Sequence, residues 1–90
     1  MSHTIQHKDK LMARLRRLKG QLEGVERALA ADAACGEILR QLASIRGAMN
    51  GLTVEVMEEH LLEHVVQAGT DAARRQGADE MIAVIRTYMK

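Results

Sequence analysis

Two heptad patterns constrain the fold of this chain. In each, apolar residues are spaced four and three apart in alternation. Such spacing lines apolar side chains along one stripe of an α-helix that packs against other helices. We therefore expect one helix from about Ile5 to Ala31 and a second from Cys35 to at least His64. The first stripe comprises Leu11, Leu15, Leu18, Leu22, Val25 and Leu29, and the second comprises Ile38, Leu42, Ile45, Met49, Leu52 and Val56.

The boundaries of these helices follow from local residue preferences. Asp32 lies in the break between the two stripes and is expected to be the N-cap of the second helix. After Gly69 the chain is polar and loosely patterned as far as Gly77. A short third helix is expected beyond Gly77. Its apolar residues are Met81, Ile82, Val84, Ile85 and Tyr88.

Length and composition favour one small all-α domain. The chain has 90 residues, one aromatic residue and no proline, which is typical of helical proteins rich in Leu, Val, Ile, Ala and Met. Two long helices with unmatched apolar stripes need partners, so we expect a four-helix core made by two chains, with further association. No apolar run approaches the roughly 20 residues needed to span a bilayer. We therefore expect a cytoplasmic protein without a membrane partner, and a single cysteine suits that reducing compartment.

Three potential metal ligands lie near the two ends of the second helix. His60 and His64 are four residues apart, so both imidazoles project from one side of a helix and can chelate one ion. Cys35 would lie about 37 Å from His60 if the helix is continuous. A mononuclear site that uses both ends must therefore cross subunits. An antiparallel partner helix achieves this, and Gly47 and Gly51 would leave room for a close crossing.

The N-terminal residues offer further nitrogen donors. Residues 1–7 are expected to form a flexible arm. If Met1 is removed, the Ser2 amine and the His3 imidazole could both bind one ion. We assign no such role to His7.

Positive charge is concentrated in the first helix. Residues 8–19 contain six Lys or Arg and one acidic residue, although the net charge of the whole chain is only +1. An isolated cluster of this kind is more often a solvated helix face. Repeated on one surface of an oligomer, however, it would suit the phosphates of double-stranded DNA. The candidate DNA-binding residues are Arg14, Arg16, Arg17, Lys19 and Arg46.

The segment from His60 to His64 also spells H-x-x-E-H, a pattern found in zinc peptidases. A peptidase needs a cleft, a third ligand from a separate element and an open water position, and 90 helical residues leave little room for them. Glu63 is more simply explained as a solvated residue beside Glu59. We therefore do not expect an enzyme.

Several segments together resemble the CsoR/RcnR family of metal-responsive transcriptional repressors. They are the start MSHTI, the run RLRRLKGQ from Arg14 to Gln21, Cys35 after the break, and the run IRGAMNGL from Ile45 to Leu52. The resemblance covers the whole chain and is closest to the nickel- and cobalt-sensing RcnR branch. It implies a three-helix protomer, an antiparallel dimer and a tetramer of two dimers. It also implies that the apo-protein binds operator DNA, that Ni(II) or Co(II) releases it, and that an efflux gene is controlled. The implied metal ligands are His3, Cys35, His60 and His64.

Differences between this chain and the other branches of the family favour the nickel- and cobalt-sensing branch. Copper(I) sensors of the family carry a second cysteine where this chain has His64, and copper(I) prefers soft thiolate ligands. The formaldehyde-responsive branch typically has proline after the initiator methionine and usually an acid at position 64, whereas this chain has Ser2 and His64. A formaldehyde- or thiol-reactive sensor that uses Cys35 remains the alternative on the same fold. Zn(II) would accept the same ligands as Ni(II) or Co(II).

Overall fold

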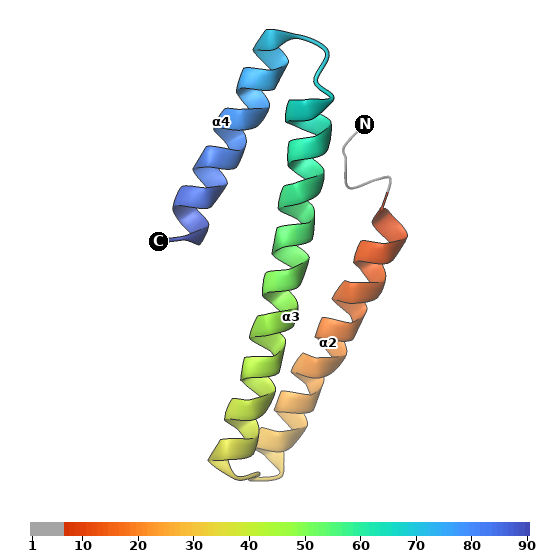
Figure 1. Ribbon diagram of the computed structural model, residues 1–90. Coiled ribbons are helices and arrows are strands. Elements are labelled where there is room, and N and C mark those ends of the chain that lie inside the picture. Colours follow the sequence, from red (N-terminus) through yellow and green to blue (C-terminus); the bar gives the residue numbers. More distant parts are fainter. Residues whose placement is uncertain (1–6) are drawn as a thin grey trace. The chain divides into compact units, whose positions relative to one another are not determined.

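The computed structural model describes residues 7–90, and this part of the chain contains helices and no strand (Figure 1). Helix α2 spans Lys8–Ala30 and α3 spans Cys35–Leu61. A π-helical segment, η1, continues α3 over Leu62–Val66, and α4 spans Asp71–Tyr88. The all-α prediction with three helices is confirmed. None of the described helices combines the length and the apolarity that crossing a bilayer requires.

The described residues form two compact units, His7–Thr53 and Val54–Lys90, and α3 contributes to both. In the first unit, α2 lies antiparallel to the first part of α3 (Figure 1). The apolar stripe of α2 divides between two environments. Leu11, Leu18 and Val25, which are seven residues apart, are buried at 7–9% exposure. The alternate members Leu15, Leu22 and Leu29 remain 45–58% exposed.

The stripe of α3 divides in the same way. Leu42 and Met49 are exposed, at 44% and 52%. Ile38, Ile45 and Leu52, which alternate with them along the stripe, are partly buried. Within this unit the antiparallel pair of helices therefore covers only alternate members of each heptad pattern. The remaining members form an apolar face, which we define as Leu15, Leu22, Leu29, Leu42 and Met49.

The turn between α2 and α3 corrects the prediction for Asp32. Asp32 has φ of 54° and is not the N-cap of α3, which begins three residues later at Cys35. The Asp32 N–H donates to the Leu29 carbonyl at 3.1 Å and the Ala33 N–H donates to the Ala28 carbonyl at 2.9 Å. This bonding pattern is the Schellman motif, in which a left-handed residue ends a helix. Asp is tolerated there because its short polar side chain can hydrogen-bond locally.

In the second unit, the third helix is longer than predicted. It begins at Asp71 and not beyond Gly77, which lies buried in its middle. Thr70 is its N-cap, and the Thr70 hydroxyl accepts a hydrogen bond from the Ala73 N–H at 3.1 Å. The prediction was wrong because Gly77 was interpreted as a helix breaker. In an 18-residue helix with a satisfied cap, one interior glycine costs only about 1 kcal/mol.

Replacing Asp32 by glycine should raise the free energy of unfolding by about 0.5 kcal/mol. A left-handed residue with a Cβ is strained by roughly 1–2 kcal/mol, and glycine offsets part of this gain through its larger loss of chain entropy. Asp32→Val should lower stability, because a β-branched residue fits this conformation poorly. Urea unfolding followed by circular dichroism, at fixed protein concentration, measures both changes. Destabilisation by Asp32→Gly would contradict the assigned backbone conformation.

Candidate functional site

The predicted histidine pair is assembled in the second unit. His60 lies in the last turn of α3 and His64 lies in η1. Their ring centroids are 4.8 Å apart, with 38° between the ring planes. The two imidazoles therefore adjoin one another, as chelation of one ion by two nitrogen donors requires.

The tautomer of His60 follows from its hydrogen bond to the main chain. Its Nε2 lies 2.9 Å from the carbonyl oxygen of Gly77. A carbonyl can only accept, so Nε2 carries the hydrogen and, in the neutral ring, Nδ1 carries the lone pair. Metal-binding histidines commonly donate their other ring N–H to a carbonyl or carboxylate in this way, which fixes the ring orientation. Glu80 Oε1 is also near, at 3.9 Å from Nε2.

A single arginine supports the end of the π-helical segment that carries His64. Arg74 Nε donates to the Val65 carbonyl at 3.2 Å, and one of its terminal nitrogens donates to the Ala68 carbonyl at 3.2 Å. The other terminal nitrogen donates to Asp71 at 2.7 Å. Carbonyls at the end of a helix lack intrahelical partners, so the guanidinium satisfies groups that would otherwise be left to water. Arg74 thereby ties the start of α4 to the end of η1.

Close packing at Gly77 also positions His64. A Cβ built on Gly77 would overlap the His64 carbonyl oxygen and would lie 2.8 Å from its carbonyl carbon. Only glycine leaves space for this approach of α4 to η1. The same residue supplies the carbonyl that accepts from His60. Gly77 therefore contacts both members of the histidine pair.

The thiol predicted as a third ligand lies elsewhere. Cys35 is the first residue of α3, and it is free and exposed. Among residues 7–90, no group of three or more His, Cys, Asp or Glu side chains is placed to hold a metal ion. The helix between Cys35 and His60 is continuous, as the expectation of an intersubunit site requires. His3 and Ser2 lie outside the described residues.

The predicted basic residues lie in the first unit. Arg16, Arg17 and Lys19 on α2 and Arg46 on α3 are exposed, whereas Arg14 is partly buried. Arg14 reaches across to α3, where its guanidinium lies 2.9 Å from the position that a Cβ on Gly51 would take. Gly51 thus makes room for Arg14 of the same chain.

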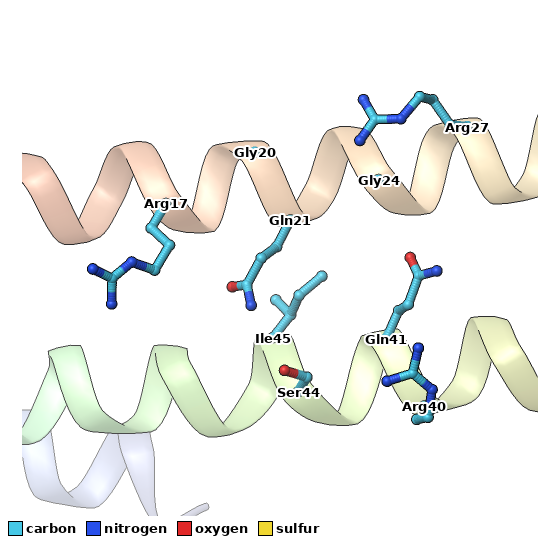
Figure 2. A pocket seen from close by; sticks show the side chains of 9 residues that line it. All are labelled: Arg17, Gly20, Gln21, Gly24, Arg27, Arg40, Gln41, Ser44 and Ile45. Carbon is cyan, nitrogen blue, oxygen red and sulfur yellow. The ribbon is translucent and has the colours of Figure 1, made fainter.

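A groove of about 480 Å³ lies between α2 and α3 near these residues (Figure 2). We call it the arginine groove, because three arginines line it. Arg40 donates to both carboxylate oxygens of Glu37, at 2.6 and 3.1 Å. This contact lowers the pKa of the Glu37 carboxyl below its usual range. The lining residues are Arg17, Gly20, Gln21, Gly24, Arg27, Arg40, Gln41, Ser44 and Ile45.

Sequence patterns assigned no role at the site to Arg74, Gly77 or Glu80, and Gly77 was expected only to precede the third helix. Their roles depend on the return of α4 along η1, a contact between segments that no local pattern encodes. One signal was available, since a glycine inside an otherwise helical apolar pattern often has a packing reason.

Comparison with known proteins identifies the family. The model of the metal-sensitive transcriptional repressor family matches residues 7–87. The chain belongs to this family. It is 42% identical over 90 residues to the transcriptional repressor RcnR of Salmonella arizonae, covering 100% of both chains. The resemblance to the CsoR/RcnR family is thus confirmed, as is the function class of metal-sensitive transcriptional repressor.

Two solved structures of family members share the fold. One is a variant of the formaldehyde-responsive regulator FrmR from Salmonella enterica serovar Typhimurium, with a glutamate replaced by histidine. It is 39% identical, with a TM-score of 0.87 over 97% of this chain and 99% of that chain. The other is the copper-sensing repressor CsoR with Cu(I) from Geobacillus thermodenitrificans, 27% identical, with a TM-score of 0.90 over 100% and 94%. Members of this fold therefore respond to different ligands.

The substitution Gly77→Ala should lower the free energy of unfolding by about 1–3 kcal/mol, because the new methyl group meets the His64 backbone. The gain in helix propensity, about 1 kcal/mol, offsets only part of this cost. Gly36→Ala is the matched control, since nothing lies within 4 Å of its added Cβ, and it should stabilise the protein. Chemical denaturation measures both. A Gly77→Ala variant at least as stable as the wild type would refute the close contact.

Proposed function

We propose that this chain is a nickel- or cobalt-responsive repressor whose apo-form binds operator DNA and whose metal-bound form releases it. The observation that carries the proposal is the adjacent histidine pair, in which the Gly77 carbonyl holds His60 with its lone pair on Nδ1. A family model of metal-sensitive repressors spanning residues 7–87 supports it. We treat residues 1–90 as a single metal-sensing, DNA-binding domain.

The proposed ligands are His3, Cys35, His60 and His64, with the Ser2 amine as a further donor. One thiolate and several nitrogen donors suit Ni(II) or Co(II), and the set contains no second thiolate to favour Cu(I). Zn(II) could use the same donors. The similarity to RcnR supports nickel or cobalt.

The set of metal ligands should be completed by residues of a second subunit. Within the described residues, no three donors come together in one chain. An antiparallel dimer would bring Cys35 of one protomer beside His60 and His64 of its partner. The apolar face on α2 and α3 is the surface on which such a partner would pack, since its side chains are 44–58% exposed. We infer a four-helix core in the dimer and a tetramer of two dimers.

The DNA surface is proposed to include Arg14, Arg16, Arg17, Lys19 and Arg46. Contacts from these residues to phosphates would fix the position of the repressor on the duplex, and DNA shape would contribute to operator choice. Binding of metal and binding of DNA are coupled through the dimer, so each should weaken the other by the same factor. A coupling of about 1–3 kcal/mol is typical. The regulated gene is inferred to encode metal efflux.

We infer a cytoplasmic repressor without enzymatic activity. The family supports this conclusion, because its description is that of transcriptional repressors.

A second candidate function is sensing of formaldehyde or another thiol-reactive compound. The specific observation in its favour is Cys35, a free and exposed thiol. The 39% identity to a variant of the formaldehyde-responsive regulator FrmR adds support. The presence of His64 beside His60 favours the metal sensor over this alternative.

Titration with Co(II) distinguishes the two candidates. Reduced wild-type protein under anaerobic conditions should bind one Co(II) per protomer and show a thiolate charge-transfer absorption band. Cys35→Ala should lose the band and the metal-dependent release of DNA, while apo-protein still binds DNA. Cys35→Ser controls for the change in side-chain volume. Absence of stoichiometric Co(II) binding to the wild type would refute the metal sensor and leave the thiol-reactive candidate.

The proposed dimer can be tested at Leu42, which is 44% exposed on the apolar face. Leu42→Glu should dissociate the dimer, because a buried carboxylate without a partner is strongly unfavourable in an interface. Ala43→Glu is the matched control, since the neighbouring side chain points about 100° away round the helix. Analytical ultracentrifugation at several concentrations gives the result. Equal masses for Leu42→Glu and the wild type would refute packing through this face.

A further inference from the structure

We propose that the arginine groove binds a DNA backbone phosphate, with Arg17, Arg27 and Arg40 as its cationic contacts. This inference rests on the proposed DNA-binding function and extends its surface beyond the basic cluster of residues 8–19. Two of these arginines, Arg27 and Arg40, are additional to the predicted DNA-binding residues. The sequence did not indicate a basic cluster at Arg27, because Glu23 and Glu26 precede it and offset its charge.

The groove and the apolar face lie on different sides of the helix pair. Arg17 follows Leu15 by two residues, and Gly24 follows Leu22 by two, which places each about 200° away round α2. Arg17 and Gly24 line the groove, whereas Leu15 and Leu22 belong to the apolar face. A partner chain packed on the apolar face would therefore leave the groove accessible to DNA.

Small residues on α2 create the space. Gly20 has nothing within 4 Å of an added Cβ. At Gly24 the same position lies 3.6 Å from a terminal nitrogen of Arg27 and 3.7 Å from Gln41 Oε1. The Arg27 guanidinium and the Gln41 amide thus both lie beside a residue without a side chain. In Figure 2, Gln21 points from α2 toward α3, and Gln41 points from α3 toward α2.

Glu37 orients the α3 side of the groove. Its carboxylate accepts from Arg40 and also from the Gln41 amide, at 3.1 Å. A guanidinium held on one edge by a carboxylate has a restricted orientation and can still donate from its remaining N–H groups. Three arginines and the Glu37 carboxylate together give the groove a net positive charge, which is complementary to the negative charge of a phosphate diester.

Gln21 also lines the groove. Its Oε1 is buried and, within the described part of the chain, has no hydrogen-bond partner. Such a group is costly unless something satisfies it. A phosphate diester only accepts hydrogen bonds and therefore does not satisfy this oxygen, so Gln21 can contribute to the groove only through its NH2 group. A phosphate in the groove would then be met by arginine and amide donors together.

The test compares Gln21→Glu with Gln76→Glu in the full-length apo-protein. Both substitutions add one negative charge at nearly unchanged size, and Gln76 lies exposed in α4. Fluorescence anisotropy over a series of salt concentrations measures binding to a fluorescein-labelled duplex with a G/C-tract inverted repeat, the type of operator that the resemblance to the CsoR/RcnR family implies. Gln21→Glu should weaken binding on the order of tenfold and reduce the salt slope by about one unit. Gln76→Glu should behave as the wild type.

A second variant, Arg27→Gln with Arg40→Gln, tests the cations without placing a carboxylate in the groove. It too should lower affinity and flatten the salt dependence, with helicity unchanged by circular dichroism. Wild-type affinity and slope in both folded variants would overturn the inference, while DNA binding through the predicted basic residues would stand. Failure of the wild type to bind the duplex at any salt concentration would overturn the proposed function and this inference with it.

Discussion

Half-burial of the two heptad patterns is the constraint on which the rest of this molecule depends. Leu11, Leu18 and Val25 are buried, whereas the members of the stripe between them are not. Two antiparallel helices can cover only part of an apolar stripe this wide, and a chain of 90 residues has little else to add. The exposed half of the apolar residues favours packing against a partner chain. The proposed metal site depends on that same partner for its thiol.

The geometry around His60 shows how a weak sequence signal becomes a structured site. Two histidines four residues apart recur by chance on helices. Here Gly77 brings α4 against the His64 backbone and accepts from His60 through its own carbonyl. Arg74 donates to one carbonyl at the end of η1 and to another two residues beyond it. The ring orientation is therefore determined by main-chain contacts that a substitution of the histidines alone would not reveal.

Opposite sides of the α2–α3 pair have different chemistry. One side presents leucines and a methionine, and the other presents the arginine groove. A helix pair with one apolar and one cationic side can associate with another protein chain and with a polyanion at once, since the two contacts do not compete for surface. Such a separation would allow a change in the packing of the dimer to alter the spacing of the cationic side chains.

The helical class, the existence of the three helices, the histidine pair and the basic character of α2 could all be predicted from the amino-acid sequence. These features depend on periodicity, spacing and charge, which are local properties of the chain. Prediction from the sequence misplaced the start of α4 and the role of Asp32, because a left-handed helix end and a buried glycine are selected by contacts rather than by propensity. Three features became visible only in the folded structure. They are which members of the apolar stripes are buried, which nitrogen of His60 carries the hydrogen, and the groove that Arg27 and Arg40 share with Arg17. Each of these depends on segments distant in sequence that meet only after folding.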